Sequence, residues 1–172
     1  MKFLIYICLL VLFTTFSYAN EKERTLKGVL LSRISQLITY RQGSEDFKIC
    51  IYKDKDMYKS LQGLYKGKKY KDLPIKVFNI GEKEEFYKCD ILYSEKIDKN
   101  LLQKFKHKEL SYTLLVSDSI DKLYDGFMLA LYLKENKIKI AINQKALQKS
   151  QLNINYRLIG AASKIINPVK EK

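Results

Sequence analysis

The sequence is poor in the residue types that most enzymes and metal proteins use at their sites. Its 172 residues include no Trp, two Pro, three Cys and one His. The single histidine, His107, lies between two lysines and is explained more simply as a solvated residue than as a catalytic base. So few histidines and cysteines make a closed zinc site unexpected, and the chain has no nucleophile elbow, P-loop, dinucleotide fingerprint or H-E-x-x-H motif. We therefore expect a protein that is not an enzyme and that holds no cofactor or metal.

Arginine is scarce as well, although the chain is basic. Lys and Arg together number 32 against 19 Asp and Glu, a formal charge of +13. Four of these residues are arginines: Arg24, Arg33, Arg41 and Arg157. Because base and phosphate recognition favours the planar guanidinium group, we expect no nucleic-acid partner and interpret the lysines mainly as a solvated surface. Attraction to phospholipid head groups or to an acidic protein face remains compatible with this charge.

One short segment, Tyr65 to Lys71, mixes tyrosines with lysines and leaves two interpretations open. Aromatic and basic residues in alternation suit a surface for single-stranded nucleic acid or for a membrane. An exposed helix-to-strand loop in a lysine-rich protein explains the same residues equally well.

The first residues have the pattern of a secretory signal peptide. Lys2 precedes an unbroken apolar run from Phe3 to Phe13, and a polar stretch then ends at Ala19. The run is shorter than the roughly 20 residues that a spanning helix needs, so cleavage after Ala19 is favoured over an uncleaved anchor. We expect residues 1–19 to be the signal peptide and residues 20–172 to form a single exported domain with no membrane span after cleavage.

Hydrophobic periodicity predicts alternating helices and strands in the first two thirds of the mature chain. Apolar residues at helical spacing, from Leu26 to Ile38, predict an amphipathic helix from Glu21 to Tyr40, with Lys27 on its polar side. The following predicted elements are a strand (Phe47 to Tyr52), a helix capped by Asp56 (Met57 to Lys66), two strands (Ile75 to Ile80, Asp90 to Tyr93), a short helix (Asn100 to Lys106) and a strand (Tyr112 to Val116).

The stretch from Ser117 to Ile166 predicts strand, strand, helix, helix. An apolar run from Phe127 to Leu133 and an alternating run from Lys137 to Ile142 predict a β-hairpin. Apolar positions at helical spacing follow as far as Ile166. The predicted fold is an α/β three-layer sandwich: a mostly parallel sheet, helices on both faces, and a C-terminal antiparallel hairpin at one edge.

Cys50 and Cys89 are the cysteines that remain after signal cleavage. An even count in an exported chain favours a disulfide between them. A redox-active pair is the alternative, but it usually has closely spaced cysteines such as C-x-x-C at the start of a helix.

Ser117 and Asp118 form a candidate ligand or partner site. They follow a predicted strand at its carboxyl end, where open α/β sheets tend to bind ligands. The simpler alternative is that they cap a helical segment over residues 120–123.

The order of motifs resembles one known family. The chain resembles the C-terminal half of the YfiR-like family in the order of five features. These are Val116-Ser117-Asp118, a polar segment ending at Gly126, an apolar strand, the run N-K-I-K-I-A-I-N ending at Asn143, and two short helices. The chain is also similar to the N-terminal half of that family. There Leu61, Leu64 and Gly67-Lys68 precede the run P-I-K-V, and a cysteine then comes directly before the run D-I-L-Y. The resemblance covers about residues 25–166.

This resemblance implies a function. Members of the YfiR-like family are small periplasmic regulators of membrane-bound signalling enzymes. The chain would then be a non-catalytic periplasmic protein that binds the periplasmic domain of an inner-membrane diguanylate cyclase or related sensor, and so lowers cyclic-di-GMP signalling and biofilm formation. A homodimer stays open, and a periplasmic small-ligand binding protein is the alternative function.

The resemblance also assigns roles to particular residues. A bridge between the strand regions of Cys50 and Cys89 is usual in the family. Lys139 and Asn143 occupy the positions of the basic residue and the terminal Asn in the family's strand-to-helix motif, where the Asn can cap the next helix. With Ser117 and Asp118 they make up the predicted partner or ligand surface.

Overall fold

The computed structural model describes residues 20–40, 43–105 and 109–167. The predicted signal peptide, His107 and Pro168 lie outside these residues. An N-terminal helix over residues 20–35 opens the described chain. The strands are β1 (Ile38–Thr39), β2 (Phe47–Tyr52), β3 (Lys69–Tyr70), β4 (Leu73–Ile80), β5 (Ile91–Tyr93), β6 (Leu114–Ser117), β7 (Leu129–Lys134), β8 (Lys137–Asn143), β9 (Asn153–Ile154) and β10 (Lys164–Ile166). The helices are α2 (Lys55–Tyr65), the 3-10 helix η1 (Lys83–Lys88), α3 (Lys99–Gln103), α4 (Lys122–Asp125), α5 (Gln144–Lys149) and α6 (Tyr156–Ala161).

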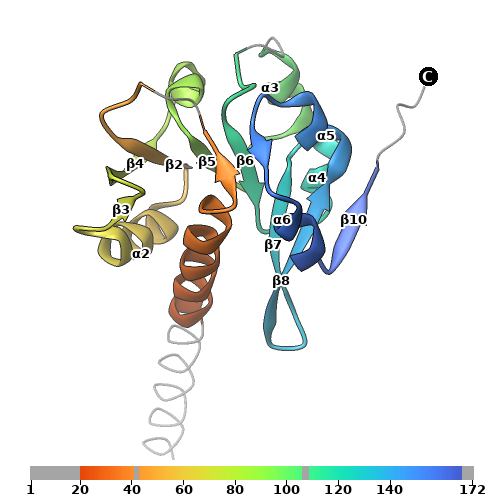
Figure 1. Ribbon diagram of the computed structural model, residues 1–172, viewed down its shortest axis with the longest axis horizontal. Helices are drawn as coiled ribbons and strands as arrows, with labels where there is room; N and C mark the ends of the chain where they lie inside the picture. Colours follow the sequence, from red (N-terminus) through yellow and green to blue (C-terminus); the bar gives the residue numbers. More distant parts are fainter. Residues whose placement is uncertain (1–19, 41–42, 106–108, 168–172) are drawn as a thin grey trace, which may run out of the picture.

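One eight-stranded sheet organises the protein, in the order β10-β8-β7-β6-β5-β2-β4-β3 (Figure 1). Strands β4, β2, β5, β6 and β7 run parallel to one another. β7 and β8 form the predicted antiparallel hairpin, and β3 pairs antiparallel with β4. β1 and β9 form a separate two-stranded antiparallel sheet. The predicted fold class, a mostly parallel α/β sheet between helices, is confirmed.

Both faces of the sheet are covered, as the aromatic residues at the two ends of β2 show. Phe47 and Tyr52 are an odd number of residues apart, so their side chains point to opposite faces. On one face Phe47 contacts Tyr40 and stacks on Tyr70, with ring centroids 4.2 Å apart in the stack. On the other face Tyr52 packs edge-on against Phe86 of η1 at 5.0 Å. The sheet is therefore the middle layer of three.

The N-terminal helix packs closely on α2. The Tyr65 hydroxyl donates a hydrogen bond of 2.6 Å to the carbonyl oxygen of Gly28. A Cβ added at Gly28 would lie 2.5 Å from the Leu61 side chain, so glycine permits this close approach. Tyr65 and Tyr70 are both buried, and the Tyr70 hydroxyl donates to the carbonyl of Ile38. Neither tyrosine of the segment Tyr65 to Lys71 is available for base stacking, and Lys69 and Tyr70 form the short strand β3 within the expected exposed loop.

Several predicted boundaries and one predicted face are wrong. The N-terminal helix ends at residue 35 instead of Tyr40, because Ile38 and Thr39 pair with β9. α2 is capped by Asp54, whose side chain accepts from the Met57 N–H, and not by Asp56. The buried side of the N-terminal helix includes Lys27, whereas Leu26, expected to be inside, is 47% exposed.

The C-terminus also differs from the prediction. Ile165 and Ile166 belong to β10, which pairs parallel with β8, and are not helical. The hairpin therefore lies near one side of the sheet with β10 outside it, at the right of Figure 1. A strand formed here because the outer backbone edge of β8 was available for pairing, which local periodicity cannot reveal.

Cys50 and Cys89 form a disulfide with Cα atoms 5.8 Å apart. It links β2 to the residue that leads into β5, its neighbour in the sheet. None of the described helices is both long enough and apolar enough to cross a membrane.

Candidate functional site

The candidate site lies where the parallel strands end. Because β2, β5 and β6 run in the same direction, the loops that follow them meet at one end of the sheet. We call this the C-terminal edge; it comprises residues 53–54, 94–98 and 117–121. The N-terminal helix and the tip of the β7–β8 hairpin project from the same end of the molecule (Figure 1).

A buried lysine connects the N-terminal helix to this edge. Lys27 is 4% exposed. Its Nζ lies 2.6 Å from Oε1 of Glu23, one turn earlier in the helix, and 2.9 Å from Oδ2 of Asp118, directly after β6. Two carboxylates therefore surround one ammonium group. The cluster has a surplus negative charge in a protein that is otherwise basic.

Burial and charge act against each other in this cluster. Burial raises the pKa of the Asp118 carboxyl, and Lys27 opposes that rise without cancelling it. Burial lowers the pKa of Lys27, but the hydrogen bonds and charges of Glu23 and Asp118 outweigh it, so the pKa of Lys27 stands above its ordinary value. The other oxygen, Oδ1 of Asp118, is buried with no hydrogen-bond partner among the described residues. The lysine is therefore charged at neutral pH and Asp118 keeps one acceptor unused.

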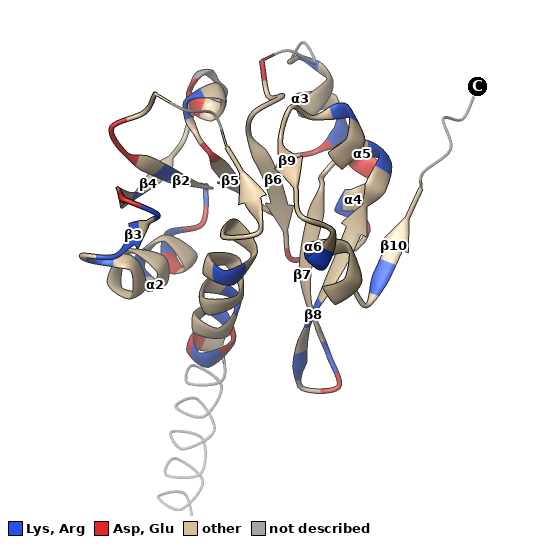
Figure 2. Ribbon diagram, viewed as in Figure 1, with Lys and Arg blue, Asp and Glu red and all other residues tan. Residues whose placement is uncertain are grey.

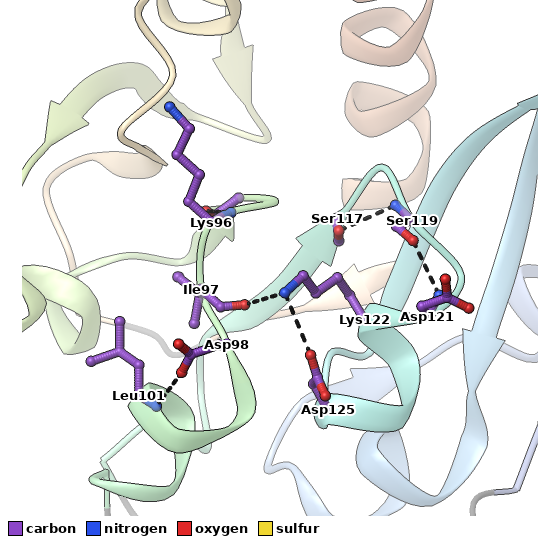
Figure 3. A network of polar contacts seen from close by, with 10 residues as sticks. Lys96, Ile97, Asp98, Leu101, Ser117, Ser119, Asp121, Lys122 and Asp125 are labelled. Carbon is purple, nitrogen blue, oxygen red and sulfur yellow. Dashed lines mark hydrogen bonds and ion pairs between the residues drawn. The ribbon is translucent and has the colours of Figure 1, made fainter.

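Two further lysines link the loops of the edge to one another. Nζ of Lys96 donates to the carbonyl of Lys53 at 2.7 Å, which joins the loop after β5 to the loop after β2. Nζ of Lys122 donates to the carbonyl of Ile97 at 2.9 Å and lies 3.4 Å from Oδ2 of Asp125 (Figure 3). Loops from different strands are held together through backbone carbonyls.

Serines order the loop after β6. The Ser117 hydroxyl accepts from the N–H of Ser119, and the Ser119 hydroxyl accepts from the N–H of Asp121 (Figure 3). Asp118 points instead to Lys27. Of the two residues that the alternative interpretation treats as a cap for residues 120–123, Asp118 pairs with Lys27 instead, and Ser117 and Ser119 make the local turn contacts.

Asn143 and Lys139 lie away from Asp118. The Asn143 side chain caps α5 by accepting from the N–H of Ala146 at 2.9 Å, as expected, and its Nδ2 also donates to the carbonyl of Leu123 at 2.7 Å. Lys139 lies in the hairpin opposite Tyr132. The four residues predicted as one surface are thus spread over the end of β6, the hairpin and the start of α5.

Sequence reasoning missed Lys27 and Glu23. Their spacing of four residues on one helix was the available signal, because such pairs are neighbours on a helix surface. The pattern does not show that this side of the helix would face the end of β6.

Neither metal binding nor a basic binding patch is supported at the C-terminal edge. Among residues 20–40, 43–105 and 109–167, no group of three His, Cys, Asp or Glu side chains is arranged to hold a metal ion. Basic residues occur on many elements, among them the N-terminal helix, the end of α2 with the following turn and β3, α5, the hairpin and β10 (Figure 2).

A hollow of about 520 Å³ lies at another place in the fold, between α5 and α6. It combines amide and apolar side chains, and its lining residues are Gln144, Leu147, Gln148, Ser150, Gln151, Leu152, Asn153, Ile154 and Ile159.

Comparison with known proteins gives one family and a shared fold. A family model described as YfiR/HmsC-like matches residues 24–163. No curated protein matches the chain. Among solved structures, a conserved domain protein from Vibrio cholerae O1 biovar eltor is similar with a TM-score of 0.53 and 13% identity, over 83% of this chain. This chain spans 60% of the length of that protein.

A second solved structure is less similar. The ABC domain in complex with L-Trp from Streptococcus pneumonia has a TM-score of 0.46 and 12% identity, over 69% of this chain and 56% of its own.

Proposed function

The chain belongs to the YfiR/HmsC-like family, and we propose that it is a non-catalytic periplasmic regulator that represses an inner-membrane diguanylate cyclase or related sensor. The observation that supports this most is the family match, which extends over residues 24–163 and so includes nearly all of the described elements. The predicted signal peptide and the Cys50–Cys89 disulfide agree with a protein that works in an oxidising compartment.

The C-terminal edge supports a binding role over a catalytic one. Enzymes with open α/β sheets keep reactive groups accessible at this edge. Here Lys27, Lys96 and Lys122 donate to carboxylates and backbone carbonyls. Their donors hold the loops in place, which suits a rigid surface for a protein partner.

Repression would work through a population shift. A regulator that binds the inactive conformation of its partner better than the active one lowers the active fraction. Its effect is limited by the ratio of the two affinities, and a shift from mostly active to mostly inactive needs a ratio of about 10⁴. The regulator needs no chemistry of its own for this.

We place the partner contact on the end of the molecule from which the N-terminal helix and hairpin project (Figure 1). Leu26, Val29 and Leu133 are exposed apolar residues on these two elements. Exposed apolar residues beside polar groups are typical of interaction sites. Asp118 lies at the edge beneath the helix and Lys139 lies in the hairpin, and both are half-buried, so these two of the four predicted surface residues remain in this proposal. Ser117 and Asn143 are buried and are not part of it.

Deletion of the gene tests the function. We expect cellular cyclic-di-GMP and biofilm to rise, and to return to normal when the full-length chain is supplied. A chain without residues 1–19 should fail to restore them, because it would stay in the cytoplasm. An unchanged cyclic-di-GMP level under several envelope stresses would contradict the proposal.

Surface variants test the contact. The double variant Leu26→Ser, Leu133→Ser should accumulate normally and fail to complement the deletion. Tyr156→Ser is a matched control, because Tyr156 is 77% exposed and lies on α6, outside the N-terminal helix and the hairpin. Full complementation by the double variant would place the contact elsewhere.

A small-ligand binding protein is the second candidate, and the hollow between α5 and α6 favours it. Its amide side chains could hydrogen-bond a polar ligand. A thermal-shift screen of envelope metabolites distinguishes the candidates: a stabilising ligand whose effect disappears in Gln148→Leu supports the ligand function. A screen without hits, together with raised cyclic-di-GMP on deletion, supports the regulator alone.

A further inference from the structure

Four exposed lysines lie within six residues, where α2 ends and the chain turns through β3 into β4. They are Lys66, Lys68, Lys69 and Lys71, and we call them the lysine cluster. The segment from residue 66 to residue 72 sets one acid, Asp72, against these four positive charges. Figure 2 shows the basic residues that gather here, at the left of the molecule beside α2 and β3. The cluster is thus a local surplus of positive charge on a projecting part of the fold.

The backbone that carries the lysine cluster is fixed to the core. Gly67 follows α2 with a φ of 71°, and Lys71, with a φ of 53°, lies in the turn between β3 and β4. Tyr70 between them is buried, and its ring stacks on Phe47 with centroids 4.2 Å apart. The ammonium group of Lys71 lies 5.3 Å from the centre of the Tyr70 ring. The lysines are therefore displayed on a rigid base.

The charges of the lysine cluster are not neutralised within the described part of the protein. None of the four ammonium groups forms an ion pair with a carboxylate there. The nearby Lys76 differs, because its Nζ lies 2.9 Å from Oδ2 of Asp46, so we do not count it in the cluster. Like charges gathered in one place repel one another, and a bound anion would relieve this repulsion.

The side chains of the segment narrow the class of anionic partner. Protein interfaces are enriched in aromatic residues and Arg and depleted in Lys, and single-stranded nucleic acid needs aromatic rings for stacking. Tyr65 and Tyr70 are both buried, and the arginines lie elsewhere in the chain. An anionic membrane surface needs neither residue type, because it attracts lysines through their charge alone.

We propose that the lysine cluster binds the headgroups of anionic phospholipids at a membrane surface. Each lysine near such a surface strengthens binding by about fivefold. Four lysines together would enrich the protein at the membrane by a factor on the order of 10²–10³, which is a weak and reversible attachment. The proposal rests on the lysine cluster and not on the regulatory function, and it uses none of the residues placed in the partner contact.

Co-sedimentation of the exported protein with lipid vesicles tests the proposal. Vesicles of phosphatidylethanolamine and phosphatidylglycerol should bind the wild type, vesicles of phosphatidylcholine should not, and added salt should release the protein. A quadruple variant with Gln at every position of the lysine cluster should bind the anionic vesicles at least about tenfold more weakly.

A second quadruple variant is the matched control, because it loses the same charge at exposed lysines on other parts of the surface. Its substitutions are Lys99→Gln, Lys104→Gln, Lys149→Gln and Lys164→Gln. It should stay within about threefold of the wild type, since charges more than a Debye length from the lipid contribute little. Equal weakening in the two quadruple variants would overturn the proposal, because the overall charge of the protein would then cause the binding.

Far-UV circular dichroism checks that the variants are folded, and the double variant Lys68→Gln, Lys71→Gln, expected to bind at least about fivefold more weakly, serves if the first quadruple variant is not. Stronger release by inorganic phosphate than by chloride at equal ionic strength would overturn the proposal in favour of a site for the free anion. A wild type that binds no vesicles would also overturn it, including the case in which the first quadruple variant fails to complement the gene deletion, which would indicate an acidic protein partner.

Discussion

Replacing Lys27 with methionine is the sharpest test of the site described above. Methionine keeps most of the side-chain volume and removes the ammonium group, so Glu23 and Asp118 are left facing each other. Breaking a fully buried ion pair costs about 3–5 kcal/mol, because it leaves a buried charge without compensation. The Lys27 side chain is 6% exposed, but the carboxylates are 27% and 25% exposed and retain some solvation. We therefore expect Lys27→Met to lower the free energy of unfolding by about 2–3 kcal/mol.

Acidification should reduce this cost. The Asp118 pKa is already raised by burial, and Lys27 is the group that holds it down. Without Lys27 the pKa of Asp118 rises further, so its carboxyl becomes neutral at a higher pH and the unpaired charge disappears. The stability deficit of Lys27→Met should thus be largest near about pH 7 and shrink toward about pH 4.

Urea unfolding of a double-mutant cycle provides the measurement. Asp118→Asn in the Lys27→Met background should recover about 1–2 kcal/mol, since the repulsion with Glu23 is then gone. Arg24→Met with Asp56→Asn is the matched control, a more exposed pair at 3.4 Å between the N-terminal helix and α2 that should couple by less than about 0.5 kcal/mol. A cost for Lys27→Met below about 0.5 kcal/mol, or one independent of pH, would refute the reasoning.

Three further stability predictions can be checked by denaturant unfolding, with immunoblots for abundance. Replacing both Cys50 and Cys89 by Ala opens a link between residues 39 positions apart and should cost about 4 kcal/mol, with lower periplasmic abundance; normal abundance with altered partner binding would indicate a redox switch instead. Asn143→Ala loses a helix cap and a buried hydrogen bond and should cost about 2 kcal/mol; a cost near zero would refute both roles. Gly28→Ala should destabilise through its helix contact, whereas Gly63→Ala, with open space around it, should stabilise by about 0.5–1 kcal/mol; equal effects would contradict the close packing.

The longer strands β2, β7 and β8 could be predicted because their signals are local. β2 and the β7–β8 hairpin follow from β-branched runs and alternation within a few residues, and their bounds agree closely with the prediction. The capping role of Asn143 is local too, since it concerns the next three residues. β10 could not be found this way, because it exists through pairing with β8 and its own sequence suits a helix equally well.

The site could be predicted only in part, for a similar reason. The position of Ser117 and Asp118 at the carboxyl end of a strand could be predicted, because the strand signal ends there. A ligand or partner site at this position stays a prediction. The partner of Asp118 could not be inferred, because the side of the N-terminal helix that faces the sheet depends on how closely the helix approaches α2 at Gly28. That approach turns Lys27 inward and leaves Leu26 exposed.

Lys27, Lys96 and Lys122 hold the loops of the C-terminal edge in place, which bears on how a partner could bind there. An ammonium group is a compact charge with three donors on a flexible stem, so it can reach a carbonyl or fit between two carboxylates where a planar guanidinium would need more space. Lys27 uses this property between Glu23 and Asp118, and Lys96 and Lys122 use it across loops. A partner that moved the N-terminal helix would have to separate Lys27 from Asp118. The binding free energy of its new contacts would then have to exceed the cost estimated for Lys27→Met. A partner that leaves the N-terminal helix in place does not have to offset this cost, so the same contacts give it a higher affinity.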